Sequence, residues 1–152
     1  MTSTPVVRQA TPDDLEAVAQ LFDQYRQFYR RASDLDAARA FIGNRLRNGD
    51  SIIFVVQAEP GGAVVGFTQL YPLFASLAIG RAFVLNDLFV SPVARGLGLG
   101  RHLLDRAARY GREAGAKYLE LSTETTNAAA QRLYEKIGWV RETGFLHYSL
   151  DL

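Results

Sequence analysis

The chain has 152 residues and a formal net charge of +1, from 17 basic and 16 acidic side chains. This length predicts one domain over residues 1–152, and 48% hydrophobic with 22% charged residues excludes a disordered chain. The lack of cysteine excludes a disulfide framework, a thiolate zinc site and a thiol nucleophile, and it is consistent with a cytoplasmic protein. The near-neutral charge and the lack of a long apolar run argue against nucleic-acid and membrane partners.

The first predicted elements are a strand and two amphipathic helices. Residues 6–9 have the composition of a short strand. A helix is expected over residues 11–30, because a Thr-Pro-Asp-Asp start favours its first turn and apolar residues then recur at spacings of three and four. A second helix is expected to begin after Ser33 or Asp34 and to end at residues 48–50.

Three strands are predicted in the middle of the chain. They cover residues 51–57, 63–71 and 82–90, with a Pro-Gly-Gly turn between the first two and an irregular connection over residues 72–80. The third strand is apolar except for Asn86 and Asp87.

The remaining elements alternate between helices and strands. In order they are a Gly-rich loop over residues 92–100, a helix over 100–114, a strand over 117–122, a helix from Asn127 to Gly138, and strands over 139–141 and 145–150. This order predicts a mixed α/β fold. We expect a mostly antiparallel central sheet of about six to seven strands, flanked by about four helices.

The clearest chemical signal lies where the apolar strand meets the Gly-rich loop. Gly96, Gly98 and Gly100 precede a helix start, and glycines of this kind let backbone amides approach a ligand closely. A helix N-terminus adds amide donors, so the segment suits a phosphate group, with Arg95 and Arg101 supplying positive charge. The spacing matches neither a dinucleotide fingerprint nor a Walker loop, and a plain Gly-rich turn is the alternative.

Two motifs resemble those of the GNAT superfamily of N-acetyltransferases. Arg95-x-x-Gly98-x-Gly100, directly after an apolar strand, is similar to its acetyl-CoA signature. Residues 127–139, which read Asn-Ala-Ala-Ala-Gln-Arg-Leu-Tyr-Glu-Lys-Ile-Gly-Trp, are similar to its second motif. The resemblance covers the chain from about Val6 to the C-terminus, and it implies the superfamily's fold and acetyl transfer from acetyl-CoA to an amine.

The resemblance also implies which residues bind the cofactor. The strand before the loop would contact the pantetheine arm, the loop amides would hold the pyrophosphate, and the second motif would contact the cofactor arm. In chain order these residues are Leu88, Phe89, Val90, Arg95, Gly96, Leu97, Gly98, Leu99, Gly100, Arg101, Asn127, Ala130 and Tyr134. No metal ligands are expected.

Tyr134 is the candidate general acid for the leaving thiolate. A tyrosine with a solution pKa of about 10 can donate a proton to a thiolate of about 8.5. Because the chain has no cysteine, an acetyl-cysteine intermediate is impossible, which predicts direct transfer in a ternary complex. The helical spacing of Tyr134 with Ala130 and Ile137 would equally suit a tyrosine of the core.

The candidate base lies in residues 85–90, a run that resembles the Hpa-type and spermidine/spermine acetyltransferases. Where the polyamine enzymes carry a glutamate implicated in amine deprotonation, this chain has Asn86, which cannot accept a proton. Asp87 is the remaining candidate base or cation anchor, but both residues can face the substrate only if a bulge intervenes. Glu120 and Glu124 are other candidate bases.

An aromatic cluster ends the first predicted helix. Tyr25, Phe28 and Tyr29 are candidate substrate contacts with Asn86 and Asp87, since aromatic faces attract ammonium groups, although core packing would explain part of the cluster. The arginines beside them would repel a polycation and accept a carboxylate, which favours an amino acid over a free polyamine.

We therefore expect direct acetyl transfer to a primary amine of a small molecule, amino acid or polyamine-like. The alternatives are a protein or histone lysine N-acetyltransferase and, in another class, a non-catalytic acyl-CoA sensor. Members of the resembled subgroup commonly dimerise, and the alternating segment 145–150 would leave an apolar edge that invites pairing, so a homodimer is expected.

Overall fold

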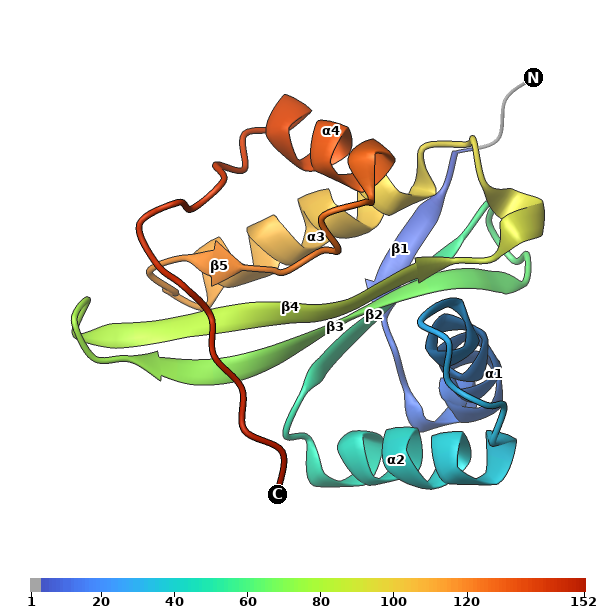
Figure 1. The fold of residues 1–152 in the computed structure, drawn as a ribbon. Coiled ribbons are helices and arrows are strands. Elements are labelled where there is room, and N and C mark those ends of the chain that lie inside the picture. Colours follow the sequence, from blue (N-terminus) through green and yellow to red (C-terminus); the bar gives the residue numbers. More distant parts are fainter. Residues whose placement is uncertain (1–3) are drawn as a thin grey trace. The chain divides into compact units, whose positions relative to one another are not determined.

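One five-stranded sheet organises the first part of the chain in the computed structural model, which describes residues 4–152 (Figure 1). The strands lie side by side in chain order: β1 (Val6–Gln9), β2 (Ile52–Gln57), β3 (Val64–Ala75), β4 (Gly80–Val90) and β5 (Leu119–Glu120). The first four pair antiparallel, and β5 joins β4 in parallel. The mixed, mostly antiparallel sheet is confirmed, with five strands among the described residues in place of six to seven.

Helices cover both faces of this sheet. They are α1 (Leu15–Phe28), α2 (Leu35–Asn48) and α3 (Leu99–Glu113), with single 3₁₀ turns over Pro12–Asp14 and Pro92–Ala94. Ile53 and Val55 of β2 pack into the core beneath α1 and α2, whereas Phe54 between them contacts Tyr110 of α3. Phe83 of β4 also contacts Tyr110. Alternate residues of one strand therefore supply two separate cores.

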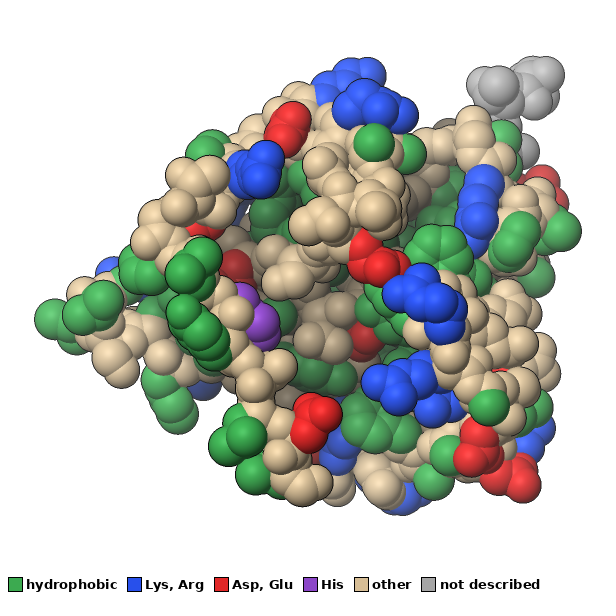
Figure 2. Space-filling model, in the orientation of Figure 1, with side chains coloured by type: hydrophobic (Ala, Val, Ile, Leu, Met, Phe, Trp, Pro, Cys, Tyr) green, Lys and Arg blue, Asp and Glu red, His purple; other side chains and the backbone are tan. Residues whose placement is uncertain are grey.

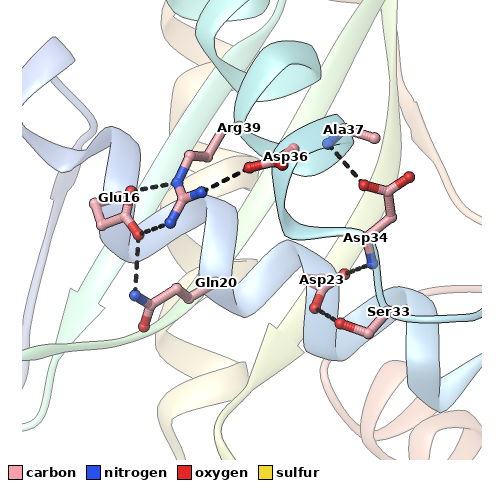
Figure 3. A network of polar contacts seen from close by, with 8 residues as sticks. All are labelled: Glu16, Gln20, Asp23, Ser33, Asp34, Asp36, Ala37 and Arg39. Atoms are coloured by element: carbon pink, nitrogen blue, oxygen red, sulfur yellow. Dashed lines mark hydrogen bonds and ion pairs between the residues drawn. The ribbon is translucent and has the colours of Figure 1, made fainter.

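The signals that predicted α2 act as expected. The Asp34 side chain caps the helix by accepting a hydrogen bond from the Ala37 amide at 3.0 Å, and Gly49 ends it in the left-handed region with φ of 60°. Ser33, the other candidate cap, instead donates to Asp23 of α1 at 2.6 Å (Figure 3). Asp34 is thus the cap, and Ser33 helps to fix the α1–α2 connection.

The β3–β4 hairpin is longer than the sequence predicted. The expected irregular connection over residues 72–80 is wrong for residues 72–75, which extend β3, and for Gly80, which begins β4. Pro72 pairs with Phe83, and it is tolerated because the pairing of β3 with β2 ends at Leu70, so the missing N–H falls on a sheet edge. The hairpin ends in almost fully exposed Leu77 and Ile79. Hydrophobic side chains gather at the left of Figure 2, the side on which Figure 1 shows the tip of this hairpin.

Residues Ser122–Leu152 form a second unit, built around α4 (Ala128–Lys136). The helix matches the prediction, since Asn127 caps it by accepting from the Ala130 amide at 3.2 Å. The predicted strand over 117–122 shortens to β5, and the strands predicted over 139–141 and 145–150 are wrong for the described residues. Alternation specifies two faces, but a strand also needs a backbone partner, and alternation does not supply one.

Among the residues from 4 onward, no helix has the length and apolarity to span a bilayer.

Candidate active site

A β-bulge interrupts β4 at Asn86. Gln69 of β3 pairs with Asp87, and the next residue, Leu70, pairs with Leu85, so Asn86 is the extra residue within the described sheet. The Asn86 carbonyl accepts a hydrogen bond from the Tyr25 hydroxyl of α1 at 3.1 Å. Asn86 and Asp87 can both face the substrate only if a bulge intervenes, and the structure has a bulge at Asn86 itself.

Asp87 is a buried carboxyl group with 4% of its surface exposed. Its Oδ2 accepts from Gln69 Nε2 at 2.6 Å, and its Oδ1 accepts from Asn86 Nδ2 at 3.3 Å. Burial raises the pKa of Asp87, while hydrogen bonds from Gln69, Asn86 and Tyr25 act in the opposite direction. A buried carboxyl whose pKa is raised in this way is suited to accept a proton during a reaction.

The groups around Asp87 form a polar network inside the sheet. Gln69 is fully buried; its Nε2 also donates to the Tyr71 hydroxyl at 3.2 Å, and its Oε1 accepts from Ser51 Oγ at 2.8 Å. Burial and the Asp87 charge raise the pKa of Tyr71 to about 12, so this hydroxyl stays neutral. The sequence motifs missed Ser51, Gln69 and Tyr71. The available signal was a glutamine inside a mostly apolar strand.

The aromatic cluster runs from the sheet along the end of α1. Tyr25 lies edge-on to Phe89 at 6.2 Å between ring centroids and to Tyr29 at 5.1 Å. Phe28 extends the row from Tyr29 at 5.2 Å and is half exposed. Tyr25 is also hydrogen-bonded to the bulge through its hydroxyl, and the aromatic row leads from the strand of Asp87 to the surface.

The Gly-rich loop leaves its backbone open. Gly96 and Gly98 have φ of 83° and 73°, and a Cβ at either position would meet no described atom within 4 Å. Helix α3 begins directly after Gly98, and no described side chain caps its first amides. Arg95 folds back instead, donating from Nε to the Val90 carbonyl at 3.1 Å with its guanidinium over the Phe89 ring. This open backbone at a helix N-terminus is suited to an anionic group.

The second motif lies in the unit built around α4. Asn127 uses its side-chain oxygen as the helix cap, and Ala130 supplies the capped amide. Tyr134 lies in the last turns of α4, where its ring is 6.2 Å from that of Trp139 and its carbonyl accepts from the Trp139 amide at 2.9 Å. The motif therefore builds a capped helix that carries Tyr134.

Residues 15–139, which include both motifs, match the model of a family described as "Acetyltransferase (GNAT) family". The chain is also 50% identical over 146 residues to the uncharacterized N-acetyltransferase YhfO of Bacillus subtilis (strain 168), an alignment that covers 96% of this chain and 97% of that protein. The chain belongs to the GNAT acetyltransferase family.

Solved structures agree with the GNAT assignment. The crystal structure of a probable acetyltransferase has a TM-score of 0.90 and 37% identity, with 97% of both chains covered. The aminoglycoside N-acetyltransferase AAC(6')-Iy in complex with CoA has a TM-score of 0.82, covers 100% of this chain and 98% of that chain, and at 20% identity shows the fold alone. The predicted GNAT family and the predicted acyltransferase activity are confirmed, whereas the Hpa-type and polyamine subgroup stays a prediction.

Proposed function

We propose that this GNAT acetyltransferase moves an acetyl group from acetyl-CoA directly to a primary amine of a small molecule, with Asp87 as base and Tyr134 as acid. The observation that carries the proposal is the buried Asp87 at the β4 bulge, three residues before the strand meets the Gly-rich loop. The proposed proton acceptor thus lies on the strand that leads into the proposed anion-binding loop.

The loop fits the pyrophosphate of acetyl-CoA. The open faces of Gly96 and Gly98 and the uncapped start of α3 among the described residues give amides that an anion can approach. The residues proposed to bind the cofactor are Leu88–Val90 and residues 95–101, together with Asn127, Ala130 and Tyr134 of the second motif. Acetyl-CoA supplies the acyl group as a thioester.

Asp87 would remove the proton that keeps an amine from acting as a nucleophile. An ammonium group is attracted to a carboxylate, and the aromatic face of Tyr25 beside the bulge adds a favourable surface for a cation. The raised pKa of Asp87, caused by burial, brings the carboxyl closer to the proton affinity of the group that it must deprotonate.

Tyr134 would donate its hydroxyl proton to the thiolate of CoA as the amide forms. Its support is its place in the second motif, together with the acid–base balance between a phenol and a thiol. A backbone amide of β4 after the bulge would stabilise the negative charge on the thioester oxygen.

The small-molecule substrate class rests on two observations. Three arginines, Arg26 in the last turn of α1 and Arg30 and Arg31 just after it, oppose a polycation and suit an amine that also carries a carboxylate, such as an amino acid. The fold neighbour AAC(6')-Iy, at 20% identity, has been solved with a bisubstrate analogue, CoA-S-monomethyl-acetylneamine, which is a small molecule. We also infer a cytoplasmic homodimer, and light scattering at assay concentration that gives a monomer mass would reject the dimer.

The test is thiol release from acetyl-CoA with amino acids, polyamines, aminoglycosides and a lysine-rich histone peptide, each against a blank without amine. Release that depends on a small amine supports the proposal, and release with the peptide alone favours a protein acetyltransferase. Calorimetric binding of acetyl-CoA with no release for any amine favours a sensor. Ping-pong initial-rate patterns would contradict direct transfer.

A further inference from the structure

The side-chain amide of Gln69 has three hydrogen-bond partners, of which one is Asp87. It has no exposed surface, and its two N–H donors go to Asp87 Oδ2 at 2.6 Å and to the Tyr71 hydroxyl at 3.2 Å. Its oxygen accepts from Ser51 Oγ at 2.8 Å. Nothing in this arrangement is needed to build the strand, since the backbone of β3 pairs with β2 and β4 independently of the side chain.

The orientation of this amide matters for Asp87. If the amide were turned over, Gln69 Oε1 would replace Nε2 at 2.6 Å from Asp87 Oδ2, and two acceptors would face one another across a buried contact. An ionised Asp87 excludes that arrangement. Ser51, just before β2, donates to Oε1 on the other side of the amide. The Asp87 carboxylate therefore sets the orientation of the amide, and Ser51 supplies the hydrogen bond that its buried oxygen needs.

We propose that Gln69, with its amide oxygen hydrogen-bonded by Ser51, is a positioning residue that holds Asp87 as the proton acceptor of acetyl transfer. The proposal rests on the role given to Asp87 under Proposed function. It adds two residues that lie outside both family motifs and act on the reaction through the carboxylate.

The titratable groups that face Asp87 come from two elements of the described network. Tyr25 from α1 and Tyr71 from β3 are the titratable groups that face it in the described network, and Arg45 and Asp50 at the end of α2 act on Tyr71. Burial raises the pKa of Asp87, and the Gln69 hydrogen bond lowers it. Loss of that bond should therefore move the Asp87 titration upward by about one pH unit, since a hydrogen bond to an ionised group is among the stronger kinds.

The first experiment titrates the protein without cofactor or amine. Carbon-13 NMR of aspartate-labelled protein follows the Asp87 carboxyl, assigned by its loss in Asp87→Asn. Gln69→Met keeps the length of the side chain and removes both donors. We expect the Asp87 titration to move upward by about one pH unit. Thr68→Val is the matched control, because Thr68 is equally buried but donates to the backbone carbonyl of Asp87 at 2.8 Å. The Asp87 titration should stay unchanged in this variant.

A second pair of variants tests Ser51 and guards against misfolding of the Gln69 variant. Ser51→Ala removes the hydroxyl and should give a smaller upward shift in the same direction, whereas Ser51→Thr keeps the hydroxyl and should restore the wild-type titration. The acidic limb of the pH dependence of kcat/KM should move with each NMR shift.

Two failures are distinguishable. An unchanged Asp87 titration in folded Gln69→Met and Ser51→Ala overturns the positioning role while leaving Asp87 as base. Full activity in Asp87→Asn overturns the role of Asp87 in the proposed function and, with it, this proposal, whatever the titrations give.

Discussion

Asp23 in the α1–α2 region and Asp87 at the β4 bulge are almost equally covered, with 6% and 4% of their surfaces exposed, yet their pKa values move in opposite directions. Asp23 lies under the α1–α2 connection and accepts from Ser33 Oγ at 2.6 Å and from the Asp34 amide at 2.8 Å, which lower its pKa (Figure 3). Burial dominates at Asp87 and raises its pKa. Surface coverage alone does not mark a reactive carboxyl. Asp87 lies much deeper in the protein than Asp23, so desolvation outweighs its donors, whereas the donors outweigh desolvation at Asp23.

The largest expected effect comes from neutralising Asp87. Asp87→Asn should lower kcat/KM at neutral pH by about 10²–10⁴, the usual contribution of a general base, while calorimetry gives an unchanged affinity for acetyl-CoA. Asp23→Asn is the matched control and should keep its turnover per folded molecule. Equal losses of activity in the two variants would remove the functional distinction between the regions.

Tyr134→Phe should reduce turnover at least about tenfold, because the leaving thiolate loses its proton donor. Acetyl-CoA binding should remain, and the loss should appear in kcat. If turnover is unchanged, Tyr134 is a packing residue beside Trp139, and the base would act without this acid.

The two aspartates should contribute with opposite signs to the pH dependence of the protein's stability. The pKa of Asp87 is raised on folding, so the free energy of unfolding should fall as the pH rises from the ordinary carboxyl pKa through the folded value, and Asp87→Asn should remove this pH dependence. The pKa of Asp23 is lowered, so its contribution is present above the ordinary value and is lost as the pH falls through the folded value. Asp23→Asn should therefore lower the free energy of unfolding at pH 7 by about 1.5–3 kcal/mol. Thermal and urea unfolding between pH 3 and 7 would measure both, and shifts of the same sign would contradict the comparison.

Smaller effects are expected from removing the hydroxyl of Ser33 or of Ser51, and the two variants should differ in which property changes. Ser33→Ala removes one donor from Asp23 and should lower the free energy of unfolding by about 1 kcal/mol, with no change in the pH dependence of kcat/KM. Ser51→Ala should change that pH dependence. A moved acidic limb in Ser33→Ala would indicate that the α1–α2 region also tunes the reaction.

The sequence predicted the local parts of this molecule well. Asp34, Gly49 and Asn127 mark helix ends because capping is settled within a few residues. The bulge at Asn86 and the contact of Gln69 with Asp87 join residues that are 18 positions apart, and strand periodicity fixes faces but not register. The extension of β3 through Pro72 was missed for the same reason, since only pairing decides which side of a strand is an edge.

The bulge gives β4 one residue more than residues 66–75 of β3, which it faces. Asn86 has no pairing partner in β3. Its deletion would therefore leave Gln69 opposite Asp87 and Leu70 opposite Leu85, with no bulge between the two pairs. Phe83 would still meet Tyr110, and Phe89 would still meet Tyr25. What would disappear is the carbonyl that Tyr25 binds and the amide beside Asp87 Oδ1. Asn86 is therefore a residue that the pairing of β3 with β4 does not require, whereas the hydrogen bonds to Tyr25 and to Asp87 Oδ1 depend on it.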